Sequence, residues 1–278
     1  MLKIKNLSFQ YGKKPVLNGV SFDLQKGIKA LVAPNGAGKT TLLNCISQQL
    51  KASGSIAIDD DEINNREILE HLTFLGDSTI LDPEIAGVDY MKYIAKTYNI
   101  GYDKIDDVAN ATEISRFYRN KIGTYSLGMK NRTMIALSIL TGTNYILLDE
   151  PLSGLDPSSV KKMKKLLLEL GRTKGIILSS HILDDINDLT DDILFLKEGK
   201  IIEYKSYSFN SLRIETSDDP KVISIFKENN IETPIDKVIV RQVELDKALS
   251  LILSSNLIVH NILNVRESLK ERYFEIFN

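Results

Sequence analysis

The chain has 278 residues, a length that fits one large domain and a small one. Hydrophobic residues make up 43% of it and charged residues 26%, which is typical of a globular protein and excludes a disordered one. The net charge of −2 provides no global basic field, and we therefore expect no nucleic-acid partner.

The single cysteine, Cys45, excludes an intrachain disulfide and suits a reducing cytoplasm. Its apolar neighbours predict a small buried side chain rather than a nucleophile. The N-terminus has no apolar core of signal-peptide length, and no stretch approaches the roughly 18 apolar residues of a membrane span. We therefore expect a cytoplasmic protein that reaches a membrane only through a partner.

The first segment of the chain predicts two strands around a turn. Residues 2–9 and 16–24 alternate between apolar and polar side chains, and residues 11–15 between them favour a turn. Tyr11 on this turn either stacks on a purine base or packs against its own strand, and the sequence leaves both possibilities open.

The next stretch, APNGAGKTT at residues 33–41, follows an apolar strand and leads into an amphipathic helix. Such a turn presents backbone N–H groups and a helix N-terminus to phosphates. Lys39 would reach the β- and γ-phosphates, and the Thr40 hydroxyl would hold Mg²⁺. Ala33 replaces the first glycine of the usual pattern, and we expect extended backbone there, which alanine tolerates. The predicted nucleotide-binding residues of this stretch are Asn35, Gly36, Ala37, Gly38, Lys39, Thr40 and Thr41.

Helical patterns dominate from about residue 66 to 140, after a further alternating strand at 54–60. Ser126 is the predicted N-cap of the last helix, and the start of that helix is a second candidate anion site. Helices are expected at residues 89–98, 105–117 and 128–140.

Residues 145–148 are apolar and run directly into Asp149 and Glu150. An apolar run this short is typical of a strand buried on both faces of a parallel sheet. Because successive side chains on a strand point to opposite sides, we expect the two carboxylates to differ in role. One would approach Mg²⁺ and the other the space beyond the γ-phosphate.

A second buried strand, residues 175–180, ends at His181, where an α/β fold places its ligand contacts. A helix at 158–171 precedes it, and a hairpin of strands at 192–196 and 200–204 follows. From about residue 206 a different order of strands and helices predicts an α+β domain of about 70 residues. We therefore expect two domains, residues 1–205 and 206–278.

Taken in this order, the elements up to about residue 205 resemble the nucleotide-binding subunit of an ABC transporter. The resemblance assigns base stacking to Tyr11, the phosphate loop to 33–41 and the signature motif to 125–129, where Ser126 and Gly128 are retained.

The same resemblance assigns the Mg²⁺-associated aspartate to Asp149, the catalytic glutamate to Glu150 and the switch histidine to His181. Residues 153–156 match the D-loop of the family. The Q-loop glutamine falls at Asp77, an aspartate that we retain as a candidate Mg²⁺ ligand.

The fold class that this resemblance implies is an α/β P-loop NTPase. It has a parallel sheet core, an antiparallel β subdomain and a helical subdomain, followed here by the small α+β domain. ATP and Mg²⁺ are the implied cofactors. The implied partner is a second ATPase subunit, identical or different, stacked head to tail so that each ATP lies between one phosphate loop and the other subunit's residues 126–128. Lys39, Glu150 and His181 would be catalytic.

The implied function is ATP hydrolysis that drives separate membrane permease subunits, docked near residues 75–120 on the inner face of the cell membrane. The SLGM form of the signature at 126–129 is similar to that of drug, peptide and antibiotic exporters. Two alternatives stay open. One is a soluble ABC ATPase acting on nucleic acid or ribosomes, and the other is a module that binds ATP without hydrolysing it.

Overall fold

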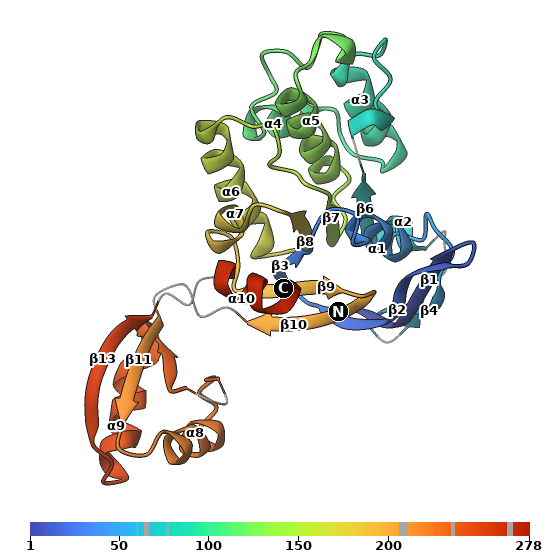
Figure 1. The fold of residues 1–278 in the computed structure, drawn as a ribbon. Helices are drawn as coiled ribbons and strands as arrows, with labels where there is room; N and C mark the ends of the chain where they lie inside the picture. The colour runs from blue at the N-terminus through green and yellow to red at the C-terminus, as the bar shows by residue number, and fades with distance from the viewer. Residues whose placement is uncertain (60, 64–66, 77, 206–210, 235–236, 266–268) are drawn as a thin grey trace. The chain divides into compact units, whose positions relative to one another are not determined.

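The computed structural model describes residues 1–59, 61–63, 67–76, 78–205, 211–234, 237–265 and 269–278. Their contacts divide the chain into two units, Met1–Tyr204 and Lys205–Asn278 (Figure 1). The predicted Mg²⁺ ligand Asp77 lies outside the described residues.

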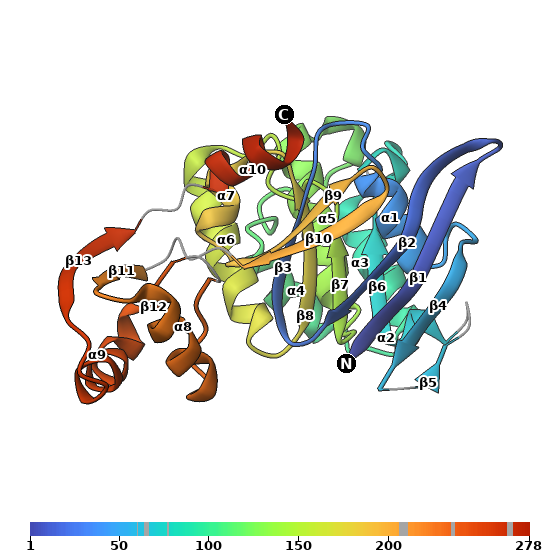
Figure 2. The ribbon, with the colours of Figure 1, turned by 60° about the horizontal axis from the view of Figure 1, so that its bottom comes forward.

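The centre of the first unit is a sheet with the strand order β10-β9-β3-β8-β7-β6 (Figure 2). Parallel pairing joins β6 to β7, β7 to β8, β8 to β3 and β3 to β9. Every residue of β7 and β8 is buried, which is why β7 and the first four residues of β8 are continuous apolar runs in the sequence. The strands are β3 (Gly27–Val32), β6 (Leu72–Leu75), β7 (Tyr145–Leu148), β8 (Gly175–Ser180), β9 (Asp192–Lys197) and β10 (Lys200–Lys205).

Strand β6 contradicts the expectation that the segment from residue 66 onward is helical. Its four residues pair in parallel with β7, directly after the one-turn helix α2 (Ile68–His71). Each element is too short to display a period of its own, and the packing of β6 against β7 and the long helix α5 (Leu127–Leu140) decides its conformation.

A second, antiparallel sheet has the order β2-β1-β4-β5. The alternating strands predicted at the N-terminus pair here, with Leu2 opposite Leu24 and Tyr11 opposite Lys14. The turn between them is only Gly12 and Lys13, shorter than predicted. The strands are β1 (Leu2–Tyr11), β2 (Lys14–Leu24), β4 (Ser53–Ile58) and β5 (Asp61–Glu62).

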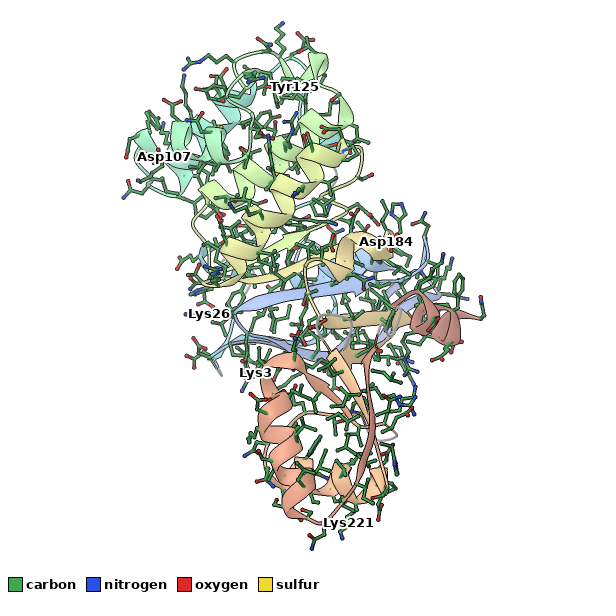
Figure 3. All side chains as sticks on the ribbon, turned by 90° about the vertical axis from the view of Figure 1, so that its left-hand side faces the viewer. Lys3, Lys26, Asp107, Tyr125, Asp184 and Lys221 are labelled. Carbon is green, nitrogen blue, oxygen red and sulfur yellow. The ribbon has the colours of Figure 1, made fainter. Side chains whose placement is uncertain are left out.

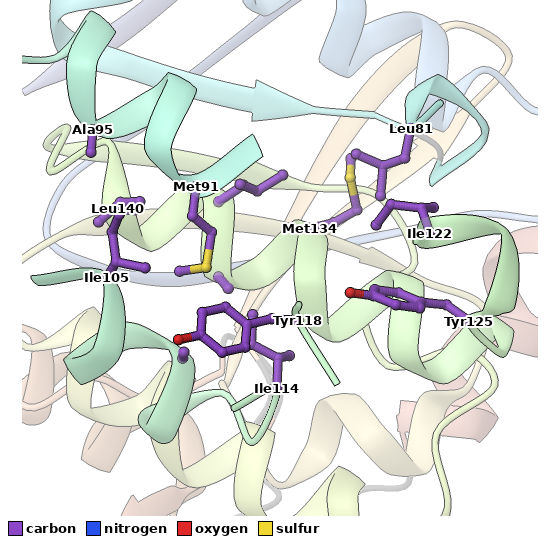
Figure 4. Close-up of a cluster of buried hydrophobic side chains, with 13 residues drawn as sticks. Leu81, Met91, Ala95, Ile105, Ile114, Tyr118, Ile122, Tyr125, Met134 and Leu140 are labelled. Carbon is purple, nitrogen blue, oxygen red and sulfur yellow. The ribbon is translucent and has the colours of Figure 1, made fainter. Parts of the chain in front are cut away.

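Helices α3, α4 and α5 pack around one buried cluster that contains Met91, Tyr118 and Tyr125 (Figure 4). The opposite face of α4 is polar, with Asp107 at the surface (Figure 3). Helix α4 ends at Ala111, short of the predicted 117, and Glu113 just beyond it has a φ of 57°, which ends a right-handed helix. The helices of this unit are α1 (Lys39–Ile46), α2, α3 (Gly87–Thr97), α4 (Asp103–Ala111), α5 (Leu127–Leu140), α6 (Pro157–Gly171) and α7 (Leu183–Asn187), with 3₁₀ turns at Ser78–Ile80 and Ile122–Thr124.

The second unit contains a three-stranded antiparallel sheet with the order β12-β11-β13. Helices α8 and α9 pack on it around a buried cluster that includes Ile214, Phe226 and Ile252. The elements are β11 (Ser211–Thr216), α8 (Asp219–Glu228), β12 (Ile239–Arg241), the 3₁₀ turn Gln242–Glu244, α9 (Leu245–Ser254), β13 (Val259–Val265) and α10 (Leu269–Phe277).

The two sheets and the helical cluster of the first unit confirm the predicted fold class, a parallel sheet core with an antiparallel β subdomain and a helical subdomain. Helix α1 leaves the carboxyl end of β3, and His181 follows the carboxyl end of β8. Parallel strands thus bring the predicted site residues to one edge of the sheet.

The environment of Cys45 predicts slow thiol chemistry in the folded protein. The side chain is buried in α1, and burial raises the pKa of the thiol from 9.0 to about 11, so that little thiolate forms at pH 8. We expect alkylation by iodoacetamide to be at least about tenfold slower in the native protein than in guanidinium chloride. A control with Cys45→Ser and Ser224→Cys, which places the thiol on the exposed face of α8, should react at similar rates in both conditions. Equal native and unfolded rates at Cys45 would contradict the burial of this helix.

Candidate nucleotide-binding site

The phosphate loop between β3 and α1 depends on two glycines with left-handed backbone. Gly36 has a φ of 78° and Gly38 a φ of 107°, which side chains disfavour. A Cβ atom at Gly38 would also lie 2.8 Å from Cγ1 of Val16. Ala33 does not have a positive φ, so alanine replaces glycine there without backbone strain, as predicted.

The ammonium group of Lys39 is buried and held by two partners. Its Nζ donates a hydrogen bond of 2.9 Å to the Ala33 carbonyl oxygen and lies 3.6 Å from Oε1 of Glu150. A buried cation is costly without such partners. The hydrogen bond from Lys39 to Ala33 therefore closes the loop and holds the Lys39 ammonium beside the Glu150 carboxylate.

A cavity of about 480 Å³ lies over this loop. Opposite the loop it is lined by Asp149 and Glu150, and Gly76 and Ser78 form part of its rim. Its lining residues from the predicted stretch are Asn35, Gly36, Gly38, Lys39, Thr40 and Thr41. Ala37 does not line the cavity, and its N–H donates to the Pro34 carbonyl oxygen at 3.2 Å.

The Asp149 carboxylate connects three segments of the site. Its Oδ2 accepts a hydrogen bond of 2.5 Å from the Thr40 hydroxyl on α1, and its Oδ1 accepts one from the Ser179 hydroxyl on β8. Asp149 itself follows the end of β7. This single carboxylate therefore fixes α1 against the two central strands.

Glu150 faces different groups from Asp149, although not for the reason that strand alternation gave. Strand β7 ends at Leu148, and Glu150 has a φ of 48°, a left-handed conformation that is uncommon outside glycine. Its N–H donates to the Ser179 hydroxyl at 2.9 Å, and its Oε2 lies 2.8 Å from Nδ1 of His181. The backbone turn aims the carboxylate at Lys39 and His181.

His181, like Ala37, is not among the residues that line this cavity, and it contacts the site through Glu150. Three further predicted residues also lie outside the cavity. Ser126 caps α5 by accepting a hydrogen bond of 3.2 Å from the Met129 N–H, and its side chain is exposed. Gly128 is buried, and a Cβ atom there would lie 2.6 Å from the Gly154 carbonyl oxygen. Tyr11 is 54% exposed and packs edge-on against Phe9 of its own strand, with 4.8 Å between the ring centroids.

The segment after Glu150 is fixed by a helix cap. The Asp156 carboxylate accepts hydrogen bonds from the N–H groups of Ser158 and Ser159 at the start of α6. Hydrogen bonds from Ser159 and Ser158 hold the pKa of Asp156 well below its ordinary value. The turn that carries Gly154 against Gly128 is thereby held in place.

Comparison with known proteins identifies the family. The ABC transporter family profile matches residues 17–153. The lantibiotic transport ATP-binding protein SrtF of Streptococcus pyogenes is 35% identical over 211 residues, covering 74% of this chain and 91% of that protein. The bacitracin transport ATP-binding protein BcrA of Bacillus licheniformis is 28% identical over 242 residues, covering 82% of this chain and 79% of that protein.

Among solved structures, a dimeric ATP-binding cassette in a post-hydrolysis state with bound ADP and phosphate matches with a TM-score of 0.66. Its sequence identity is 23%, and the match covers 74% of this chain and 98% of the other, which shows the shared fold. The chain belongs to the ABC transporter family and is an ATP-binding, ATP-hydrolysing subunit. Within the described residues, every helix is too short or too polar to span a membrane.

Ser179 is a site residue that the sequence analysis missed. Its hydroxyl donates to Asp149 and accepts from the Glu150 N–H, and the residue is 0% exposed. The available signal was a polar side chain inside a strand that is otherwise apolar, since a buried hydroxyl needs partners.

We expect Ser179→Ala to slow ATP turnover by about tenfold, the effect of losing a hydrogen bond to a charged group. The loss should appear in kcat with KM for ATP little changed, because Ser179 positions the acids without lining the cavity. Ser138→Ala is the matched control, since Ser138 is a 1% exposed serine that bonds only within α5. Equal kinetics for the two variants would show that Ser179 does not position the catalytic acids.

Proposed function

We propose that this subunit hydrolyses ATP to drive the export of peptide antibiotics or related drugs through separate permease subunits. The observation that carries the proposal is the Glu150 carboxylate, held between Lys39 and His181 at the edge of a nucleotide-sized cavity. The names of SrtF and BcrA, which describe lantibiotic and bacitracin transport, support the class of cargo. The match to a transporter family favours this function over the nucleic-acid alternative.

In this mechanism Glu150 accepts a proton from the attacking water, and His181 holds the γ-phosphate. Lys39 and the N–H groups of the loop neutralise the charge that develops on the phosphate oxygens. The separate contacts of Asp149 and Glu150 support a division of labour between the two carboxylates. Asp149 is already bonded to Thr40, whereas Glu150 faces the space over Lys39.

The residues at this edge suit Mg²⁺, which prefers oxygen ligands and keeps several waters and phosphate oxygens in its shell. The Thr40 hydroxyl and the Asp149 carboxylate lie together beside the cavity and would hold it. Bound Mg²⁺ would supply charge neutralisation at the phosphates. Such a site needs few protein ligands, and the described residues contain no cluster of three or more metal-binding side chains.

The position of Ser126 supports a head-to-tail dimer. The side chain is exposed at the start of α5, outside the cavity over Lys39 of the same chain. A helix N-terminus attracts phosphate, so this surface would serve an ATP bound to a second subunit. The dimeric cassette that shares this fold is consistent with that arrangement.

We expect Glu150→Gln to lower ATP turnover by roughly 10²–10⁴-fold, the usual contribution of a general base, while ATP binding persists. The trapped ATP should then hold two copies together, so that light scattering of a dilute sample gives a dimer with Mg-ATP and a monomer without nucleotide. At the same dilution, the wild-type protein should stay mainly monomeric because it hydrolyses the bridging ATP.

Two controls separate these effects. Glu169→Gln removes an exposed carboxylate of α6 and should leave turnover and mass as in the wild type. Adding Ser126→Arg to Glu150→Gln should retain ATP binding but block the dimer. Turnover at the wild-type rate in Glu150→Gln would exclude the general-base role, and an ATP dimer that survives Ser126→Arg would exclude the head-to-tail interface.

The cargo is tested in the organism that encodes the chain. Replacing the gene with its Glu150→Gln variant should lower the minimum inhibitory concentration of a lantibiotic or of bacitracin, because export stops. The Glu169→Gln strain should match the parent. Unchanged sensitivity to both peptides, with turnover lost in the purified variant, would reject peptide export while leaving the ATPase mechanism intact.

A further inference from the structure

The second unit has an edge strand that lacks the usual protection against pairing with another strand. Strand β13 lies at one end of the sheet order β12-β11-β13 and has no further strand beside it in the described structure (Figure 1). It is seven residues long, and residues 256–265 contain no Asp, Glu, Lys, Arg or Pro. Charges, proline and short length are the devices that normally keep such edges from pairing.

The other edge strands of the chain have these devices. Strands β2, β5 and β10 each carry charged side chains. Strands β6 and β12 are only four and three residues long. The long, uncharged β13 is therefore an exception within the same molecule.

The backbone of Ile262 faces the open edge. Its partner on β11 is Ile214, whose N–H donates to the Val238 carbonyl oxygen at 2.9 Å and therefore points toward β12. Opposite residues in an antiparallel pair alternate between bonded and non-bonded pairs, so the Ile262 N–H and carbonyl point away from β11. The Ile262 N–H is instead bonded to Oδ1 of the adjacent Asn261 at 3.0 Å.

Ile262 is the central residue of the strand, which reads VHNILNV from Val259 to Val265, so a two-fold axis there gives the longest overlap of two copies. If a second copy pairs with it antiparallel about this residue, Ile262 lies opposite Ile262 and valine opposite valine. The Ile262 N–H and carbonyl would then exchange hydrogen bonds with the same groups of the second copy. Ile262 and Leu263 are 40% and 41% exposed, so the pairing would also bury apolar surface.

We propose that two copies of this chain associate through antiparallel pairing of β13 with β13, about a two-fold axis at Ile262. The contact is isologous and closes at a dimer. It uses neither ATP nor Ser126, and so it is independent of the head-to-tail contact.

The test is sedimentation of the full chain in EDTA without nucleotide. The wild type should be a monomer in dilute solution and should form a dimer as its concentration rises. Ile262→Lys should weaken this dimer by at least about tenfold, because like charges meet at the axis and apolar burial is lost. Leu263→Lys is the matched control with equal exposure, and it should weaken the dimer far less because its lysine would face Asn261 of the second copy.

A cross-linking experiment fixes the register. In a Cys45→Ser background, the Cα atoms of Ile262→Cys would lie about 5.5 Å apart across the axis, within reach of a disulfide. Those of Leu263→Cys would be diagonal neighbours about 7–8 Å apart, beyond that reach. Air oxidation should link the first variant and not the second.

Three results would overturn the proposal. They are a wild-type chain that stays monomeric at all concentrations, equal weakening by the two lysines, or equal cross-linking of the two cysteines. The first of these results includes the case in which the edge of β13 binds an extended peptide while the chain itself stays monomeric. The ATP-dependent dimer of Glu150→Gln should persist in Ile262→Lys, which separates a failure here from a failure of the ATPase mechanism.

Discussion

The Asp149 carboxylate is the interaction on which the rest of the site depends. It accepts hydrogen bonds from Thr40 on the helix after the phosphate loop and from Ser179 on the neighbouring strand. Since Ser179 also accepts the Glu150 N–H, one chain of bonds sets the phosphate loop, both acids and the end of β8 relative to one another. The buried Ser179 hydroxyl at the centre of this chain of bonds is satisfied as both donor and acceptor, which favours a single arrangement of the catalytic edge.

Patterns that span a whole element could be predicted from the sequence. Strand β7 is apolar throughout and β8 is apolar up to its two final serines, and the positions of β1 and β2 follow from alternation, so both the parallel core and the antiparallel sheet were expected. The sequence patterns did not predict the four-residue strand β6, and they predicted a helix α4 that extends beyond its observed end at Ala111. In both places a contact distant in sequence or a single residue with positive φ decides the structure, and neither leaves a periodic trace.

At the site, the motifs predicted which residues gather but not how they are held. The lining of the cavity by Lys39, Thr40, Asp149 and Glu150 follows from the ends of β3 and β7 meeting at one edge of the sheet. The different directions of the two acids were expected from strand alternation, yet they arise from the left-handed backbone of Glu150 after the strand has ended. Ser179 escaped notice because its role lies in tertiary hydrogen bonds, which no spacing along the chain encodes.

The Glu150 carboxylate lies between the two groups that we propose hold the γ-phosphate. Glu150 lies 3.6 Å from the Lys39 ammonium and 2.8 Å from His181, and these are the two groups that would hold the γ-phosphate. A phosphate that binds Lys39 and His181 must displace this carboxylate, and like charges would then drive Glu150 toward the space where a water can reach it. In the proposed mechanism, binding of the substrate and exposure of the base would thus be one event.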